Sequence, residues 1–293
     1  MSSNDSLVSI YIPSHKRPKE LKAAVDSVLK QDYSNIELIV VLDGICPESV
    51  SFLTELSKAN KRVKFLVNEE AQGACNARNR AISSAQGEFI TGLDDDDLME
   101  ADCISEYIKH WDDNYAFLCA SYSIFGVNST RFEHRTTEYN PIDLTERNYV
   151  GNQVFTKASR LKKVAFDEEM TAWQDYDCWL RLAYTSNKKL LKLGKSLYRV
   201  NVDPNRARIT TGTRTAKGAQ QFLAKHIDKL DGKVHFWLFS DLVNRGQKIP
   251  IWLVISLLGT SQGKRAFYFM IKHSTLGNFA FSFKNMIAKL SNK

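Results

Sequence analysis

Residues 7–42 read LVSIYIPSHKRPKELKAAVDSVLKQDYSNIELIVVL, and this stretch decides the fold. Its two apolar runs, residues 7–12 and 36–42, have the length and the β-branched content of buried strands. Between them, apolar side chains recur at helical spacing, at Leu21, Ala24, Val25, Val28 and Leu29. The stretch therefore predicts a strand, a covering helix and a second strand parallel to the first.

The same alternation continues through the first hundred residues. A helical stretch near residues 48–59 leads to a short strand at residues 63–67, and the helical segment ACNARNRAISSA follows Gly73. Residues 88–93, EFITGL, form another strand. Strands alternating with helices predict an α/β nucleotide-binding half, with a mostly parallel central sheet flanked by helices.

Composition fits an ordinary globular chain. The 293 residues are 43% hydrophobic and 25% charged, with six Pro and fourteen Gly, which excludes collagen-like and low-complexity classes. Five Cys without paired spacing argue against a disulfide scaffold or a zinc cluster. Residues 1–7 lack the blocks of a signal peptide, and no run reaches 18 apolar residues. We expect a cytoplasmic protein.

Charge is divided unevenly along the chain. Residues 1–183 hold 20 Lys and Arg against 29 Asp and Glu, a net charge of −9. Residues 184–293 hold 20 basic residues against four acidic ones, a net charge of +16. This division indicates an acidic working domain followed by a basic region that meets an anionic partner such as lipid headgroups, nucleic acid or a phosphorylated substrate. A solvated basic face is the alternative.

Polar residues follow the predicted strands at Ser14, Asp43 and Asp94. Ligands of open α/β sheets bind at the carboxyl ends of strands, so we expect these residues to lie at one site. A GxGxxG fingerprint is absent from the sequence, which disfavours nicotinamide or flavin chemistry.

Four consecutive aspartates, Asp94 to Asp97, come directly after a strand. Side chains alternate along a strand, so Asp94 and Asp96 are expected to face one side. Mg²⁺ or Mn²⁺, held by one or two carboxylates and by substrate phosphates, would relieve the repulsion between these charges. The alternative is a solvated acidic turn, but the apolar residues on both sides favour a metal.

The segment GACNARNRAI, from Gly73, places Arg78 and Arg80 near the start of a helix. A helix N-terminus with a nearby arginine can bind a phosphate through backbone N–H groups and the guanidinium. A surface helix with two solvated arginines is the other interpretation.

In order, these segments resemble glycosyltransferase family 2, whose catalytic domains have the GT-A fold. The resemblance rests on SIYIPSHKRP with Pro13 and Ser14, on IELIVVLDG with Asp43, on Ala77-Arg78-Asn79, and on Asp94-x-Asp96. It covers roughly residues 6–211. We therefore expect a catalytic domain at residues 1–211 and a separate helical region at residues 212–293.

The resemblance implies a donor site. In it, Asp43 contacts the nucleotide base, Arg78 lies near the base or the diphosphate, Asp94 meets the ribose or a metal-bound water, and Asp96 holds Mn²⁺ or Mg²⁺. The run of four leaves a second register open, Asp95 with Asp97. The predicted donor-binding residues are Pro13, Ser14, Asp43, Arg78, Asp94, Asp95, Arg206 and Arg208, the last two as a lid over the diphosphate.

Gln174-Asp175 stands where the family has a Glu-Asp pair, whose Asp is the general base. Inverting transfer needs a carboxylate to take the proton of the acceptor hydroxyl, and Asp175 suits this role. Asp177 is the alternative base. On a helix, Asp175 and Trp179 share a face by their spacing, whereas Asp177 projects elsewhere.

Three further positions follow from the resemblance. Asn152 and Trp173 are expected to contact the acceptor sugar; a turn and a core tryptophan are the alternatives. Asn201 occupies a position where many relatives have a metal-binding or diphosphate-binding His. Its amide oxygen is a possible ligand for a hard cation, so the expected metal residues are Asp96 and Asn201.

The basic region has a helical pattern from Lys217 onward, followed by interleaved aromatic and basic residues. Its apolar run at residues 249–258 is too short to span a bilayer. We expect these helices to lie in the membrane interface at the cytoplasmic face. A helical hairpin packed on the catalytic domain and a homodimer contact are the alternatives.

The sequence thus predicts an inverting glycosyltransferase. It is expected to move one sugar from a nucleotide-sugar donor, a UDP-hexose or UDP-N-acetylhexosamine, to a lipid-diphosphate-linked saccharide in O-antigen-type or capsule-type synthesis. One alternative is a sugar-nucleotide nucleotidyltransferase, which should carry a glycine-rich N-terminal loop that this sequence lacks. The other is a nucleic-acid-binding protein that uses the basic tail; we expect no nucleic-acid partner.

Overall fold

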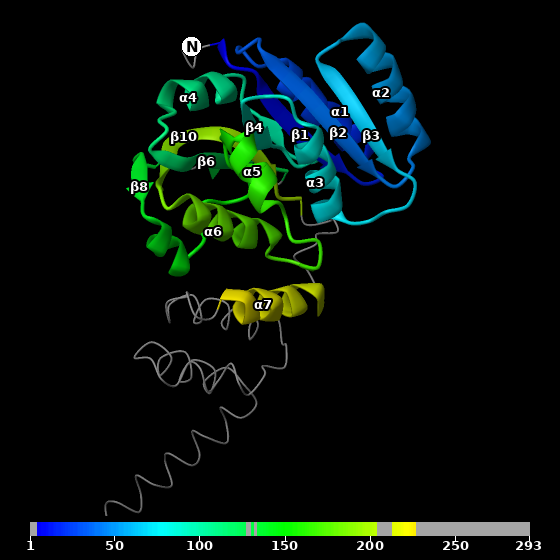
Figure 1. Cartoon of the computed structure of the whole chain (residues 1–293). Coiled ribbons are helices and arrows are strands. Elements are labelled where there is room, and N and C mark those ends of the chain that lie inside the picture. The colour runs from blue at the N-terminus through cyan, green and yellow to red at the C-terminus, as the bar shows by residue number, and fades with distance from the viewer. Residues whose placement is uncertain (1–4, 127–129, 132–133, 204–212, 227–293) are drawn as a thin grey trace, which may run out of the picture. The chain divides into compact units, whose positions relative to one another are not determined.

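The computed structural model describes residues 5–126, 130–131, 134–203 and 213–226 (Figure 1). Two compact units divide the chain. The first is made of Met1–Pro141, Tyr149–Met170 and Gln174–Ala207, and the second of Ile142–Asn148, Thr171–Trp173 and the chain from Arg208 onward. The predicted boundary after residue 211 falls outside the described residues and stays a prediction.

The first sheet of the first unit has the strand order β3-β2-β1-β4-β9. Its members are β1 (Val8–Ser14), β2 (Ile36–Asp43), β3 (Val63–Asn68), β4 (Phe89–Gly92) and β9 (Thr156–Lys157). The first four are parallel, and β9 pairs with β4 in the antiparallel sense. Every residue of β1 and β2 is buried, which explains their continuous apolar runs. The predicted strands are confirmed.

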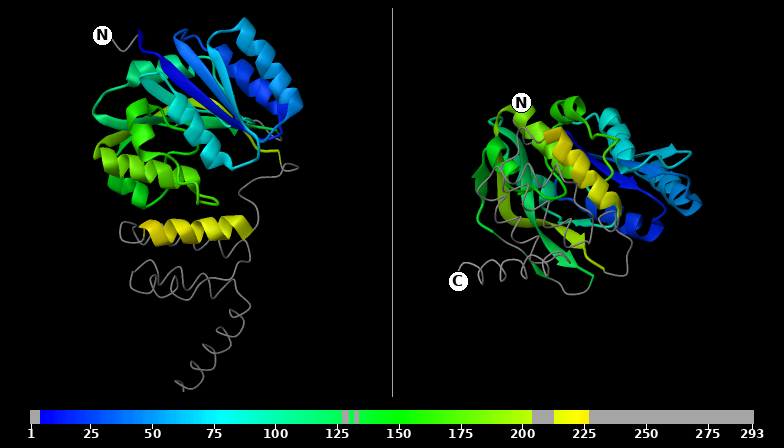
Figure 2. Two further views of the ribbon diagram at one scale, coloured as in Figure 1. Left: turned by 45° about the vertical axis from the view of Figure 1, so that its right-hand side comes forward. Right: turned by 90° about the horizontal axis from the view of Figure 1, so that it is seen from below.

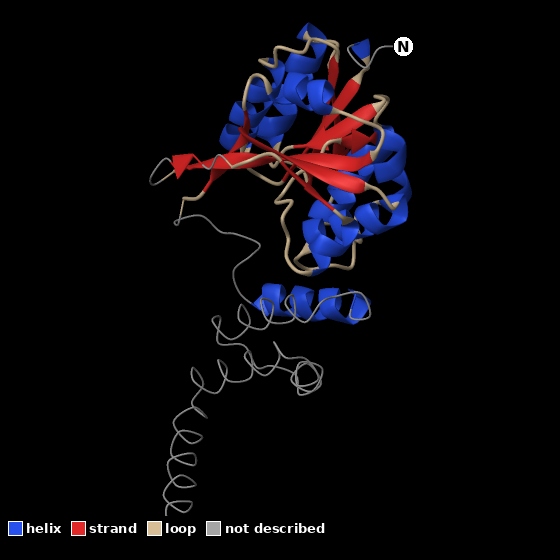
Figure 3. Cartoon of the chain, turned by 90° about the vertical axis from the view of Figure 1, so that its left-hand side faces the viewer, coloured by secondary structure: helices blue, strands red, loops and turns tan. Residues whose placement is uncertain are grey.

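Helices lie on both sides of the strands (Figures 2 and 3). α1 (Pro18–Leu29) and α2 (Pro47–Ala59) both begin with proline, which lacks the N–H that a first turn leaves unpaired. α3 (Ala74–Ser84) connects β3 back across the sheet to β4. Because such crossovers are right-handed, α1 and α2 cover one face and α3 covers the other.

A second sheet follows the order β5-β10-β6-β7, with β8 also paired to β10. The long strands β6 (Tyr115–Phe125) and β10 (Lys189–Asn201) run parallel. The short strands β5 (Leu98–Met99), β7 (Thr130–Arg131) and β8 (Thr137–Tyr139) pair antiparallel to them. Since β5 begins directly after the four aspartates, the second sheet fixes one end of that run.

Stacked aromatic rings join the two sheets. The Phe155 ring stacks on Phe89 and on Tyr107, each with a centroid distance of 5.0 Å. Phe155 also forms an isolated antiparallel bridge with Leu118 of β6.

The remaining helices of the first unit are α4 (Cys103–His110), α5 (Ala158–Val164) and α6 (Gln174–Ser186).

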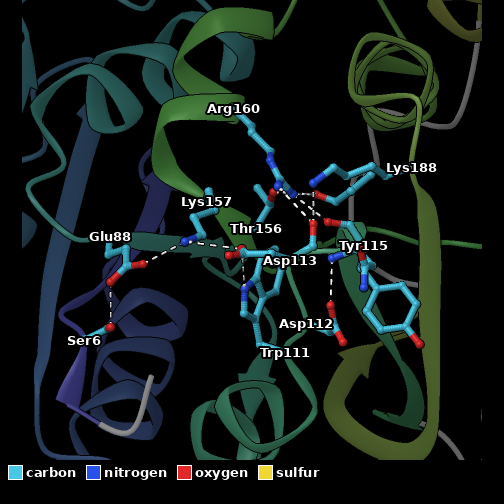
Figure 4. Close-up of polar contacts among 12 residues, drawn as sticks. Ser6, Glu88, Trp111, Asp112, Asp113, Tyr115, Thr156, Lys157, Arg160 and Lys188 are labelled. Atoms are coloured by element: carbon cyan, nitrogen blue, oxygen red, sulfur yellow. Dashed lines mark hydrogen bonds and ion pairs between the residues drawn. The ribbon is translucent and has the colours of Figure 1, made fainter. Parts of the chain in front are cut away.

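Polar contacts fasten β9 at the junction of the sheets (Figure 4). Thr156 Oγ1 donates to the carbonyl of Ala116 at 2.8 Å. Lys157 Nζ lies 2.8 Å from Glu88 Oε1 and 3.3 Å from Asp113 Oδ1. Because β9 contacts both sheets, the residues directly before it, which include Gln153, are held in a fixed position.

The second unit contains the 3₁₀ helix η2 (Pro141–Thr145) from its second residue onward, and α7 (Thr213–His226). Phe222 and Leu223 of α7 are fully buried, so the predicted helix is confirmed as far as His226. No helix in the described part of the chain is long and apolar enough to cross a bilayer. The apolar run at residues 249–258 and its basic, aromatic neighbours lie outside the described residues.

Candidate active site

The acidic run forms a turn at the carboxyl edge of the first sheet. β4 ends at Gly92, and the Asp97 N–H donates to the Asp94 carbonyl at 3.1 Å. The chain has therefore already left the strand, so a turn orients these side chains and strand alternation does not. The turn nevertheless gathers Asp94, Asp96 and Asp97, whose carboxylate oxygens lie within 4.8 Å of one another.

Asp95 points away from this cluster. Its side chain is buried and accepts hydrogen bonds from Ser14 Oγ at 2.7 Å and from the Arg17 guanidinium at 3.0 Å. Burial raises the pKa of Asp95, even though Ser14 and Arg17 favour the charged form. Ser14 is the last residue of β1, so Asp95 ties the acidic turn to that strand. In a metal register of Asp95 with Asp97, the oxygens of Asp95 would have to serve the ion as well as Ser14 and Arg17.

The chemistry of the cluster fits a hard divalent cation. Three carboxylates offer the oxygen ligands that Mg²⁺ and Mn²⁺ take in proteins. Asp97 Oδ1 also accepts the backbone N–H of Asn201 at 2.9 Å, while the amide oxygen of Asn201 accepts the Asp203 N–H at 3.1 Å. Asn201 thus adjoins the cluster through its main chain, and its side chain as a metal ligand stays a prediction.

Arg78 of α3 connects the acidic turn to α6. Its guanidinium donates to Asp94 Oδ1 at 3.0 Å and to Gln174 Oε1 at 3.3 Å, and it lies 3.7 Å from Asp175 Oδ1. The Arg78 side chain is only 8% exposed, and it stacks over the Phe166 ring. Burial would lower its pKa, but Asp175 and Asp94 more than offset that effect. A permanent positive charge therefore separates two carboxylates.

Asp175, in the first turn of α6, has the properties of a general base. Burial raises its pKa to about 6; Arg78 opposes the shift and Asp94 adds to it. Its Oδ1 is buried and accepts no hydrogen bond from the described residues, while the side chain as a whole keeps 30% of its surface exposed. Such a carboxylate is charged at neutral pH and is close to the pH at which it exchanges protons.

Asp177 occupies a different environment. Its carboxylate is fully buried and lies 2.6 Å from the Arg181 guanidinium, which also donates to the carbonyls of Val164 and Ala165. Asp177 thereby fixes α6 against the end of α5. This position agrees with the sequence-based expectation that Asp177 projects away from Asp175.

Asp43 closes the loop that leads into α3. Its carboxylate accepts the backbone N–H groups of Gln72 at 2.7 Å and Gly73 at 2.8 Å, and also the Asn68 side-chain amide. Gly73 has φ of +96°, a value that glycine adopts without strain. Asp43 therefore shapes the start of the Arg78 helix, and its contact with a nucleotide base stays a prediction. Pro13, next to Ser14, is buried within β1.

Asn79 attaches the segment before α6 to α3. Its amide oxygen accepts the Phe166 N–H at 2.8 Å, and its amide nitrogen donates to the Phe166 carbonyl and to Glu168, both at 2.9 Å. The neighbouring residues Arg78 and Asn79 thus act together. Arg78 contacts Asp175, and Asn79 holds the segment that leads to the helix of Asp175.

Replacing Asn79 with alanine is expected to lower the free energy of unfolding by about 1–3 kcal/mol, because the buried Phe166 N–H loses its acceptor. Urea unfolding measures this. Asn76→Ala is the matched control, since Asn76 contacts Glu168 but not Phe166. Equal destabilisation by the two changes would contradict the assignment.

The acceptor candidates occupy different parts of the molecule. Asn152 is exposed in the segment before β9. Trp173 belongs to the second unit, where its ring packs against Phe222 at 6.2 Å. Arg206 and Arg208, the expected lid residues, lie outside the described residues.

Sequence reasoning missed two residues of the site. Arg17 lies 3.0 Å from Asp95 Oδ1 and 3.3 Å from Asp96 Oδ2. Gln153, beside Asn152, donates from Nε2 to Asp94 Oδ1 at 3.4 Å. Both contacts join positions about 60 or 80 residues apart, so the sequence does not show which side chains they bring together.

Several curated glycosyltransferases are similar to the chain, among them two from Escherichia coli. WcaA of Escherichia coli strain K12, named as a colanic acid biosynthesis glycosyl transferase, is 33% identical over 272 residues, which cover 89% of this chain and 96% of the relative. WfgD of Escherichia coli, a UDP-Glc:α-D-GlcNAc-diphosphoundecaprenol β-1,3-glucosyltransferase, is 39% identical over 127 residues, which cover 43% of this chain and 49% of the relative.

Solved structures share the fold. S. aureus TarS 1–349 in complex with UDP-GlcNAc superposes with a TM-score of 0.62 at 16% identity, over 91% of this chain and 81% of that chain. The mannosyltransferase PcManGT from Pyrobaculum calidifontis, in complex with GDP-Man and Mn²⁺, gives 0.59 at 15% identity, over 97% of this chain and 81% of that chain. The expected GT-A fold is confirmed.

The family assignment rests on the sequence match over the first unit. The family model described as glycosyl transferase family 2 matches residues 9–173, which contain the first sheet, the acidic turn and Arg78. Together with the nearly full-length similarity to WcaA, this match shows that the chain belongs to glycosyltransferase family 2.

Proposed function

We propose that this glycosyltransferase transfers one sugar, with inversion, from a nucleotide-sugar donor to a lipid-diphosphate-linked saccharide during assembly of a surface polysaccharide. One observation carries the proposal: Asp175 and the acidic turn contact the same guanidinium, that of Arg78. A proton acceptor and a candidate metal site thus adjoin one fixed positive charge.

The reaction assigns a role to each of these groups. As the acceptor hydroxyl attacks the anomeric carbon, Asp175 takes its proton, and the bond between that carbon and the diphosphate oxygen breaks on the opposite face. Gln174 accepts from Arg78 without adding a negative charge, so it does not compete with Asp175 for the proton. The nucleoside diphosphate leaves with the bonding electrons.

Asp96, with Asp94 and Asp97, would hold Mn²⁺ or Mg²⁺. When bound, the ion supplies positive charge that stabilises the departing diphosphate. Arg78 keeps Asp94 in place from the other side, and Arg17 does the same for Asp95 and Asp96. The protein thereby holds four like charges in one turn before any donor arrives.

The donor is a UDP-hexose or a UDP-N-acetylhexosamine. The name of WfgD, which specifies UDP-Glc, and the TarS complex with UDP-GlcNAc support this choice. The PcManGT complex holds GDP-Man, so the same fold also accepts a different base. A donor panel must therefore include both nucleotides.

The acceptor is a saccharide on a lipid diphosphate, as the name of WfgD specifies for that enzyme. The net charge of +16 over residues 184–293 supports a peripheral position on an anionic membrane surface at the cytoplasmic face. Co-sedimentation with anionic and neutral vesicles tests this position. A homodimer formed through the same region would instead give a concentration-dependent mass without vesicle binding.

A donor screen tests the proposed reaction. Purified protein is mixed with UDP-, GDP- and dTDP-sugars, with and without Mn²⁺ or Mg²⁺, and the released nucleoside diphosphate is measured beside sugar-nucleotide binding by calorimetry. We expect metal-dependent release from one UDP-sugar. If no sugar nucleotide binds, the proposed donor class is wrong; release of pyrophosphate from a nucleoside triphosphate and a sugar phosphate would instead indicate a nucleotidyltransferase.

A further inference from the structure

Gln153 has a buried oxygen that the described protein does not use. The side chain is 7% exposed, and its Oε1 accepts no hydrogen bond from the described residues. An unpaired buried acceptor costs about 1–3 kcal/mol. The amide nitrogen has a partner in Asp94, but the described residues supply no donor to the oxygen, so a bound ligand is the candidate donor.

The pairing of β9 places Gln153 beside the site. Ile90 of β4 pairs with Thr156 of β9 in the antiparallel sense. Gln153 lies three residues before Thr156, and its Oε1 lies beside Gly92, the last residue of β4, at the edge where the acidic turn begins. The contact from Gln153 Nε2 to Asp94 Oδ1 agrees with this placement.

The same contact fixes which way the amide faces. Asp94 is a carboxylate that accepts hydrogen bonds, so the NH₂ group of Gln153 must face it. The amide oxygen then lies over Gly92, where an added Cβ would approach it to 2.3 Å and the Tyr11 ring to 2.4 Å. Because Gly92 has no side chain, there is room for the amide of Gln153 beside it. The terminal torsion of glutamine is soft, so the oxygen can turn toward a ligand.

The proposed function indicates what that ligand is. Two buried oxygens accept no hydrogen bond from the described residues, Gln153 Oε1 and Asp175 Oδ1. They belong to residues on either side of the Arg78–Asp94 ion pair, and Asp175 Oδ1 also lies 3.7 Å from the Arg78 guanidinium. A hexosyl group moving from the diphosphate to the acceptor must pass between the acidic turn and the base. The hydroxyl groups of that hexosyl group can donate hydrogen bonds to these two oxygens.

We propose that Gln153 accepts a hydrogen bond from a hydroxyl of the bound sugar and so helps to select the sugar that is transferred. This inference rests on the proposed function. Sites that hydrogen-bond a substrate hydroxyl discriminate strongly against analogues that lack it. Gln153 therefore acts on the sugar, whereas the acidic turn acts on the diphosphate.

Gln153→Met tests the proposal, because methionine keeps the length of the side chain and removes both polar atoms. Calorimetry compares UDP with the UDP-sugar that the parent protein binds. We expect the affinity for UDP to stay the same and the affinity for the UDP-sugar to fall about tenfold or more. The melting temperature without ligand should change little, because removal of the oxygen without a donor offsets loss of the contact from Nε2 to Asp94.

A monodeoxy series of the same UDP-sugar identifies the hydroxyl. The parent should lose affinity for one deoxy analogue, and Gln153→Met should bind that analogue as well as it binds the parent sugar. Gln86→Met is the matched control, because Gln86 is exposed and pairs with Lys64 at the other end of β4. If affinity is unchanged while the KM of a lipid-diphosphate-linked GlcNAc rises, Gln153 contacts the acceptor and the proposed contact with the transferred sugar is wrong.

Three further results would overturn the inference. Equal losses for UDP and the UDP-sugar would mean that Gln153 acts on the nucleotide. A fall in melting temperature with unchanged binding and KM would mean that Gln153 only supports the fold. If the parent protein binds no sugar nucleotide, the proposed function fails and the inference fails with it, whereas failure of Gln153→Met alone leaves the function standing.

Discussion

Replacing Asp175 with asparagine is expected to slow sugar transfer by about 10²–10⁴-fold, the usual contribution of a positioned proton acceptor. Asparagine keeps the size of the side chain and an oxygen for Arg78, but it cannot take a proton. Donor affinity should change little. Initial rates at saturating donor, measured beside calorimetric donor binding, separate these two effects.

The dependence of kcat/KM on pH is a second test of the role of Asp175 as the general base. Because the pKa of Asp175 is raised to about 6, the parent kcat/KM should fall as the pH drops through that value and the base becomes protonated. The acid limb should be absent from Asp175→Asn. The variant should also be at least as stable as the parent at pH 7, since burial disfavours the charged form of Asp175 in the folded state.

Asp177→Asn is the matched control for Asp175. It leaves the Arg181 guanidinium without its buried partner, so it should destabilise the protein. The folded fraction of Asp177→Asn should keep the fall of kcat/KM at low pH that the parent protein shows. Near-normal turnover in Asp175→Asn, together with an inactive but folded Asp177→Asn, would assign the base to Asp177 instead.

The second large effect is expected at the acidic turn. Asp96→Asn removes one of the three carboxylates that can hold the cation. Because charge stabilisation by a bound ion is worth several kcal/mol, kcat/KM should fall by about 10²-fold or more. The concentration of Mn²⁺ that gives half-maximal activity should rise, and chelation should abolish parent activity until Mn²⁺ is restored.

Two further variants distinguish the register of the turn. Asp95→Asn should lower stability through the contacts with Ser14 and Arg17, and the Mn²⁺ requirement should stay that of the parent. Asp26→Asn removes one exposed charge from α1 and controls for net charge. A Mn²⁺ requirement that moves in Asp95→Asn and not in Asp96→Asn would favour the register of Asp95 with Asp97.

The parallel half of the fold could be predicted because its signals are local. Strands buried on both faces give unbroken apolar runs, and α1 shows its buried side at Leu21, Ala24, Val25 and Val28. Parallel strands bring their carboxyl ends to one edge, which places Ser14 and the acidic turn together as expected. The contact from Ser14 to Asp95 confirms that geometry.

The details of the site depend on distant contacts. The sequence alone left Arg78 between a phosphate-binding and a solvated interpretation, because its partner on α6 is about a hundred residues away. The sequence did not single out Gln153 beside Asn152, since its contact with Asp94 depends on how β9 pairs with β4. The orientation within residues 94–97 depended on a turn that replaces the extended strand after Gly92.

The late position of β9 and α6 has a consequence for biosynthesis. All four parallel strands of the first sheet, and the Arg78–Asp94 pair, lie within the first 94 residues. At 5–20 residues per second, a ribosome needs about 4–16 s to add the next 80 or so residues, up to Asp175. We expect the nascent chain to order its nucleotide-binding half in that interval. The proton acceptor then docks onto a guanidinium already in place, and β10, which pairs with β5 beside the acidic turn, is completed only in the final third of translation.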